Sequence, residues 1–253
     1  GAGASTLLLQ TVIPALATAD AESRVQVTGG THVAGSPSFD YLARHWASAV
    51  GGHGRESQCE QETAGFAPRG AGEISAEVMP WKRPSTLVLD DRGPLVGVHG
   101  LSGSSRIKDD VASRQRDAAQ ALLWEERRID AAWEVEEVEA SSPGAFLLLW
   151  AVFERGRGAF CFLGERGLPS EILGERAARR LLRFLDNDDA AVDACLADQL
   201  AVPLALAGGG GRVSTPEVTT HLETVAAVVT RFGIPARTWG RHGGPGGLEV
   251  ERC

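Results

Sequence analysis

The sequence of 253 residues lacks the features that mark membrane and secreted proteins. Its longest apolar candidate, STLLLQTVIPALATA, is interrupted by Gln10, Thr11 and Pro14 and falls short of the roughly 18 apolar residues that a membrane-spanning helix needs. No basic segment precedes it, which argues against a signal peptide. We therefore expect no contact with a membrane.

Cysteine is scarce, and no two cysteines form a CxxC pair. The chain has four of them, far apart: Cys59, Cys161, Cys195 and Cys253. This spacing argues against structural zinc and against a disulfide framework. It suits a reducing compartment, so we expect a soluble, cytoplasmic protein.

The histidines also lack the spacing of metal ligands, so no metal site is predicted from the side chains. Five are expected to be ordinary residues: His32, His45, His53, His99 and His242. The net charge of −8 and the pI of about 5.3 weaken any role in coating DNA or RNA, for which a protein is usually basic. A few arginines can still hold a nucleic-acid end inside an acidic molecule.

What is present is an alternation of helix and strand patterns, which predicts an α+β protein. Helices are expected at residues 5–19, with Ser5 or Thr6 as cap and Pro14 kinking or ending the first half, at 38–52 and at 190–209. Strands are expected at residues 23–30, 71–81 and 85–93, and an apolar hairpin at 144–167. Residues 94–187 have their own hydrophobic set and are interpreted as an inserted domain between body segments 1–93 and 188–253.

His221 opens the stretch HLETVAAVV and has two interpretations. In the first it merely starts a helix, in which Thr219 or Thr220 is the cap and Glu223 supports the first turn. The buried face would then be formed by Val225, Ala226, Val228 and Val229. In the second interpretation the imidazole is a nucleophile, and the pattern alone favours the first.

Three further stretches carry candidate binding residues. Asp198 and Gln199 lie in the otherwise apolar segment CLADQLAVPLALAGG, where they either face solvent or border a pocket. The glycine-rich turn in GGTHVAGSPSFDYL can hold phosphate through backbone N–H groups, but it matches no established phosphate motif. Arg69, in GFAPRGAGEI, is either a surface residue or a phosphate ligand.

The arginines of ERAARRLLRF are expected on the solvated face of a helix, with nucleic-acid contact as the alternative. They are Arg176, Arg179, Arg180 and Arg183.

Taken together, these segments resemble the RNA 3′-terminal phosphate cyclase family. The matching stretches occur in the family's order: LLLQTVIPAL, SRVQVTGGTHVAGSPSFDYL, FAPRGAGEISAEV, CLADQLAVPLALAGGG and HLETVAAVV. The resemblance implies a body of repeated units, each with two helices on a four-stranded sheet, as in the C-terminal domain of a translation initiation factor. It also implies a smaller α+β insert.

The resemblance implies a reaction as well. An RNA 3′-phosphate would become a 2′,3′-cyclic phosphodiester while ATP is cleaved to AMP and pyrophosphate, with Mg²⁺ or Mn²⁺ as the accompanying ion. His221 stands at the family's nucleophile position and would carry AMP. Asp198, Gln199 and Gln10 match nucleotide-pocket segments. Pro37 and Tyr41 match the loop and helix beside the adenine, and Tyr41 would stack on the base or else pack in the core.

The resemblance also marks a departure. The family begins with a further repeat that carries a GEGGGQ-type motif and phosphate-binding arginines, and no such motif occurs in these 253 residues. We therefore expect weak or absent cyclase activity from this piece. Two alternatives stay open: a non-catalytic cyclase-like protein of ribosome assembly, which His221 argues against, and a transferase of the enolpyruvyl class.

Overall fold

The chain folds into three sheets with helices packed on each. The computed structural model describes residues 1–51, 57–81, 86–108, 110–187 and 189–252. The strand orders are β1-β3-β2, β10-β11-β9-β4 and β6-β5-β7-β8. This mixture confirms the predicted α+β class. The repeated two-helix, four-stranded unit stays a prediction, as do the boundaries at residues 93 and 187.

The first sheet consists of β1 (Ser23–Gly29), β2 (Ser57–Thr63) and β3 (Gly72–Val78), with β3 in the centre and both pairings antiparallel. The sequence analysis missed β2. Its sequence, SQCEQET, is polar, and its side chains alternate between half-buried and exposed. Its strand state is therefore set by pairing with β3 rather than by apolar periodicity.

Helix α1 (Ser5–Leu16) packs on this sheet and continues through Pro14. The expectation that Pro14 ends the first half was wrong. The helix continues although proline, which has no backbone N–H, removes one of its hydrogen bonds. Ser5 and Thr6 were also wrong as caps, since the cap position is Ala4. Their hydroxyls instead donate to the carbonyls of Gly30 at 2.9 Å and Pro37 at 2.8 Å, which fixes α1 against the glycine-rich loop.

The helix predicted at 38–52 is a π-helical segment, η1 (Tyr41–Trp46), followed by α2 (Ala47–Gly51). The amide of Ala47 donates to the carbonyl of Leu42, five residues back. The predicted core residues of this segment are all buried: Phe39, Leu42, Trp46 and Val50. The predicted glycine closure at Gly52 lies outside the described residues.

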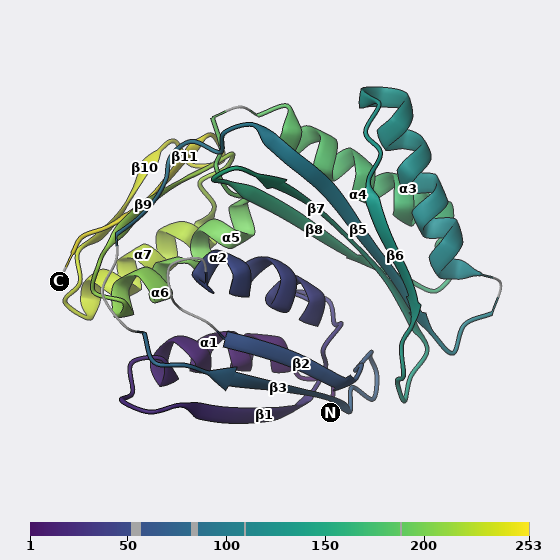
Figure 1. The fold of residues 1–253 in the computed structure, drawn as a ribbon, viewed down its shortest axis with the longest axis horizontal. Helices are drawn as coiled ribbons and strands as arrows, with labels where there is room; N and C mark the ends of the chain where they lie inside the picture. The colour runs from purple at the N-terminus through teal and green to yellow at the C-terminus, as the bar shows by residue number, and fades with distance from the viewer. Residues whose placement is uncertain (52–56, 82–85, 109, 188, 253) are drawn as a thin grey trace.

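The second sheet consists of β4 (Leu87–Leu89), β9 (Gly211–Thr215), β10 (Ala236–Gly240) and β11 (Gly246–Val250). Helices α5 (Ala194–Gln199), α6 (Ala201–Leu206) and α7 (Thr220–Arg231) lie on its inner side (Figure 1). A single helix over residues 190–209 was the wrong expectation. Pro203 cannot donate to the carbonyl of Gln199, and the chain breaks into α5 and α6 at Leu200.

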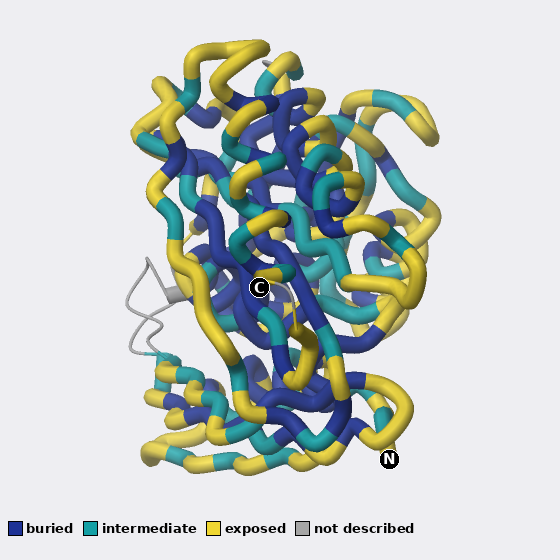
Figure 2. Tube along the Cα trace, turned by 90° about the vertical axis from the view of Figure 1, so that its right-hand side faces the viewer, coloured by how far each residue is buried: buried dark blue, intermediate teal, exposed yellow. Residues whose placement is uncertain are grey.

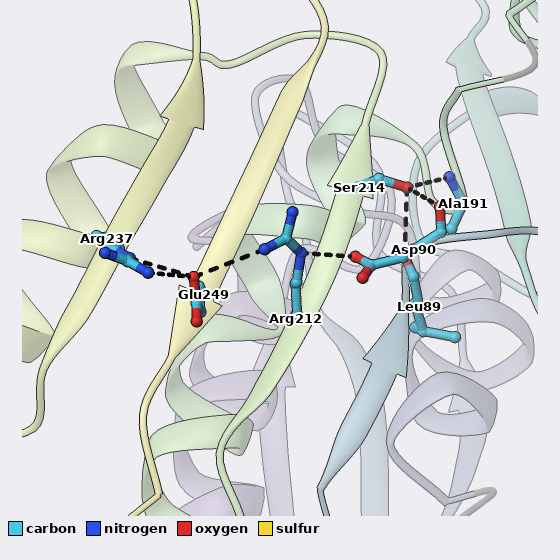
Figure 3. Close-up of polar contacts among 7 residues, drawn as sticks. All are labelled: Leu89, Asp90, Ala191, Arg212, Ser214, Arg237 and Glu249. Atoms are coloured by element: carbon cyan, nitrogen blue, oxygen red, sulfur yellow. Dashed lines mark hydrogen bonds and ion pairs between the residues drawn. The ribbon is translucent and has the colours of Figure 1, made fainter.

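Polar contacts connect this second sheet to the segment that leads into α5 (Figure 3). The buried hydroxyl of Ser214 on β9 accepts from the amide of Ala191 at 2.9 Å and lies within 3.1 Å of the Asp90 carbonyl oxygen. Across the outer face, Arg212 pairs with Asp90 at 3.1 Å and with Glu249 at 3.8 Å. The Ser214 contacts hold the segment before α5 against the sheet and, being buried, stabilise the fold more than the exposed ion pairs do.

The third sheet consists of β5 (Leu95–Ser105), β6 (Ala132–Glu137), β7 (Gly144–Phe153) and β8 (Arg157–Leu163), so the predicted hairpin is confirmed. Helices α3 (Val111–Arg127) and α4 (Ser170–Leu185) cover one face. Strand β7 is buried on both faces: Leu147 and Leu149 pack under these helices, and Phe146 and Leu148 join the main core. This explains its continuous apolar sequence.

Figure 1 shows how the layers combine. Helices α1, α2, α5, α6 and α7 lie inside the ring of sheets, while α3 and α4 lie outside the third sheet. Figure 2 shows buried segments running through the middle of the molecule and exposed segments at its periphery. None of the helices in the described ranges has the length and apolar character to cross a membrane.

Candidate functional site

A cavity of about 740 Å³ lies where α1, η1, β8, α4, α5, α6 and the start of α7 meet. Six residues that the sequence analysis assigned to nucleotide chemistry line it, although they come from both ends of the chain. They are Gln10, Pro37, Tyr41, Asp198, Gln199 and His221. The structure thus brings the six together, and their roles stay predictions.

Arg69, the seventh predicted site residue, is not among the residues that line this cavity. It is exposed in a turn that the Gly70 amide closes onto the Phe66 carbonyl at 2.8 Å. The arginine that does line the cavity is Arg180 of α4, which the sequence analysis placed on a solvated helix face. Arg180 is exposed there, and its guanidinium lies 5.5 Å from the centre of the Phe160 ring.

His221 lies in the first turn of α7 and is exposed. Thr219 caps the helix, as predicted, by accepting from the Leu222 amide at 3.1 Å. The predicted buried face is only partly right, because Val228 is 46% exposed whereas Ala226 and Val229 are buried. The apolar face of α7 therefore packs inward without burying the imidazole.

Asp198 and Gln199 end α5 and also line the cavity. Burial raises the pKa of the Asp198 carboxyl to about 7; the nearby Asp193 carboxylate adds to the rise, and the charge of His221 opposes it. A carboxyl with such a pKa can hold or release a proton near neutral pH.

Two buried side-chain atoms in the lining have no hydrogen-bond partner within the described part of the chain. They are Nε2 of Gln10, an amide donor, and Oε1 of Gln199, an amide acceptor. An unsatisfied buried polar atom costs about 1–3 kcal/mol unless something binds it. Gln10 and Gln199 thus bring one unsatisfied amide donor and one unsatisfied amide acceptor into the wall of the cavity.

Asp193 is a buried hub that the sequence analysis did not single out. Its carboxylate caps α5 by accepting from the amides of Cys195 at 3.0 Å and Leu196 at 2.9 Å. The Ala159 amide on β8 also donates to it, at 3.1 Å. An aspartate just before a helix is an N-cap signal in the sequence, but the link to β8 is visible only in the fold.

Two side chains of η1 complete the hub. The Tyr41 hydroxyl donates to Asp193 at 3.3 Å, and His45 Nε2 donates to it at 2.7 Å. Burial lowers the pKa of His45, which favours a neutral ring that donates to the carboxylate through Nε2. Burial, followed by the charge of Asp193, raises the pKa of Tyr41, which stays a phenol. His45 is thus a structural partner of the cavity wall.

The π-helical geometry of η1 lets it hold both ends of α5. Tyr41 and His45 reach Asp193 at the start of α5, and Trp46 Nε1 donates to the Gln199 carbonyl at its end, at 3.3 Å. In an α-helix, positions five residues apart are turned by roughly 140° from each other. In a helix closed by i to i+5 bonds they lie on one side, which is why Tyr41, His45 and Trp46 all face α5.

No group of three or more histidine, cysteine, aspartate or glutamate side chains suited to a metal ion occurs among the described residues.

The fold and the site define an α+β protein with a large, mostly apolar cavity that carries a few polar side chains and is bordered by an exposed histidine. The RNA 3′-terminal phosphate cyclase family matches residues 1–235. The chain belongs to this family.

Proteins described as RNA 3′-terminal phosphate cyclase show the same relationship. The one from Ralstonia nicotianae is 39% identical over 233 residues, which cover 91% of this chain and 65% of the relative. The one from Halobacterium salinarum is 34% identical, with the same coverage. The one from Thermococcus gammatolerans is 34% identical over 252 residues, covering 99% of this chain and 72% of the relative. The chain thus spans about 65% of the length of the first two.

Proposed function

We propose that the 740 Å³ cavity binds ATP and that the protein takes part in converting RNA 3′-phosphate ends to 2′,3′-cyclic phosphodiesters. The observation that carries the proposal is the meeting of six residues from distant parts of the chain on one cavity, two of them with unsatisfied buried amide atoms. Membership of the cyclase family supports the reaction class.

His221 is the proposed nucleophile. A phosphate monoester is a poor electrophile without a good leaving group, so the RNA end must first be activated. A neutral ring nitrogen of His221 attacks the α-phosphorus of ATP, the bond to the β-phosphate oxygen breaks, and pyrophosphate leaves. The resulting histidine–AMP passes AMP to the RNA 3′-phosphate. The neighbouring 2′-hydroxyl then attacks that phosphate and releases AMP. The exposure of the imidazole supports this role.

The remaining cavity residues hold the nucleotide in this proposal. Gln10 and Gln199 supply an amide donor and an amide acceptor to the base or ribose. Asp198 holds the His221 ring or a ribose hydroxyl. Pro37 and the Tyr41 ring flank the base, while the Tyr41 hydroxyl stays on Asp193. Mg²⁺ or Mn²⁺ would accompany the triphosphate and neutralise its charge.

The test is covalent labelling of this chain with ATP radiolabelled at the α-phosphate, in the presence of Mg²⁺ or Mn²⁺. We expect acid-labile AMP on the wild-type chain and none on His221→Ala. His242→Ala is the matched control, because His242 is also exposed but pairs with Glu223 at 3.0 Å and does not line the cavity. We expect it to label normally.

ATP binding, measured by equilibrium dialysis, separates two failures. Binding without label would contradict the nucleophile and favour a non-catalytic relative that keeps the nucleotide site. Neither binding nor label would contradict the whole proposal for this chain.

A further inference from the structure

A second, smaller hollow of about 250 Å³ adjoins the large cavity. Four residues line both, two from the glycine-rich loop and two from β8: Gly35, Ser36, Cys161 and Phe162. The loop and β8 therefore form a common wall that passes from one hollow into the other. A ligand longer than a mononucleotide can lie along this wall.

Helix α4 supplies an arginine to each hollow. Arg176 lines the smaller one and Arg180 the larger one, and both are exposed. Positions four apart lie on the same side of a helix, with a rise of about 6 Å between them. This separation is comparable with the length of one nucleotide in an extended strand.

The other two arginines of α4 have a different arrangement. Arg179 pairs with Glu175 at 3.5 Å, and neither Arg179 nor Arg183 lines either of these two hollows. The four arginines of this helix thus fall into two pairs. Arg176 and Arg180 line the two hollows along the common wall, whereas Arg179 and Arg183 do not.

Aromatic rings accompany the two arginines. Phe162 borders both hollows, and Phe160 borders the large one beneath the Arg180 guanidinium. Guanidinium groups beside aromatic rings are typical of grooves that hold single-stranded nucleic acid, where phosphates meet arginine and bases stack on rings. Glu165 also lines the smaller hollow, where its carboxylate can accept from a base amino group or a 2′-hydroxyl but repels phosphate.

We propose that the smaller hollow binds the nucleotide that precedes the 3′-terminal one in single-stranded RNA. Arg176 contacts the phosphodiester of that nucleotide, Phe162 supports its base, and Arg180 faces the terminal nucleotide in the large cavity. This inference rests on the proposed function, because it assumes that the RNA end reaches His221.

The experiment compares two ligands that share the same end: a pentauridylate with a 3′-phosphate, and uridine 3′-phosphate, which has no preceding nucleotide. In Arg176→Ala we expect binding of the pentauridylate to weaken about threefold to tenfold at 0.1 M salt, with a salt slope lower by about 0.7, the value for one lost phosphate contact. Binding of uridine 3′-phosphate and labelling of His221 by ATP should not change.

The matched control is Arg179→Ala, which removes the same charge from the same helix outside both hollows. We expect it to bind both ligands as the wild type does, and thermal melting should show both variants folded. The subsite is refuted if Arg179→Ala weakens the pentauridylate as much as Arg176→Ala, or if Arg176→Ala leaves it unchanged or weakens both ligands equally.

The two proposals can fail separately. If His221 is labelled but Arg176→Ala does not weaken RNA binding, only the subsite is contradicted. If the chain takes no label but Arg176→Ala weakens pentauridylate binding, only the histidine–AMP step is contradicted. A chain that neither labels nor binds RNA loses both.

Discussion

Asp198 stands out at the residue scale because its carboxyl has a pKa of about 7 in the fold, against an ordinary value of 3.8. Between these two values the folded state binds more protons than the unfolded state. This contribution to stability is therefore full below pH 4 and is lost as pH rises towards 7. Above pH 7 the buried carboxylate is a cost to the fold, which is consistent with a residue kept for its chemistry.

We predict that Asp198→Asn removes this pH dependence. As pH rises from 5 to 8, the free energy of unfolding of the variant should increase by about 1–2 kcal/mol relative to that of wild type. This is less than the shift would give at about 1.4 kcal/mol per pKa unit, because water screens the partly exposed carboxyl. Urea unfolding at the two pH values measures the change. Asp20→Asn, at an exposed position, is the control and should show no such gain. Parallel curves for wild type and Asp198→Asn would contradict the raised pKa.

Single residues also show what sequence can and cannot give. The segments around His221 and Asp198 carry recognisable patterns, and both residues line the cavity as their motifs implied. Asp193 and His45 lie 148 positions apart in the sequence, so no local pattern could announce their hydrogen bond. The tight turn around Arg69 is compatible with a phosphate ligand, but a turn does not reveal which way its side chain faces. Arg180 gives no distinct signal in the sequence, because a helix arginine usually faces solvent.

At the scale of elements, apolar periodicity predicted the hairpin of β7 and β8, because both strands carry long apolar runs. It missed β2, whose polar side chains give no such signal. It also took η1 for an ordinary α-helix, because the apolar spacing is compatible with both. The i+5 geometry suits the hydrogen bonds of η1 side chains to Asp193 and Gln199, and these partners lie about 150 residues further along the sequence.

The clamp of η1 on α5 leads to a prediction for Trp46, which is fully buried and bonded to the Gln199 carbonyl. Trp46→Phe removes that donor and leaves a small void, so we expect a loss of about 2 kcal/mol of unfolding free energy and weaker ATP binding. Trp124→Phe, on α3, makes the same chemical change at a residue that is 50% exposed. It should cost less than about 0.5 kcal/mol. Equal effects of the two substitutions would show that Trp46 does not hold the cavity wall.

At the scale of the whole molecule, β7 joins the two hydrophobic cores. Leu147 belongs to the core under α3 and α4, and Leu148 belongs to the main core that also contains α5, α6 and α7 residues. The strand that carries them cannot leave one core without disturbing the other. Residues 95–185 are thus attached to the rest by shared interior and not only by the chain.

We therefore predict that Leu147→Ala and Leu148→Ala each lower the free energy of unfolding by about 2–5 kcal/mol, and that unfolding stays a single transition in both. Urea titration followed by both circular dichroism and tryptophan fluorescence measures this. Val96→Ala is the control, since Val96 is on β5 but 66% exposed. Two separate transitions in either core variant would show that the third sheet unfolds independently.

The position of the cavity has a consequence for the resistance of the protein to proteolysis. Leu7 and His221 border the same space from opposite ends of the chain, and β8 and α4 border it from the middle. A molecule held there would bridge segments that otherwise meet only through packing. Occupancy should then slow digestion by trypsin over the whole chain, including arginine sites far from the ligand.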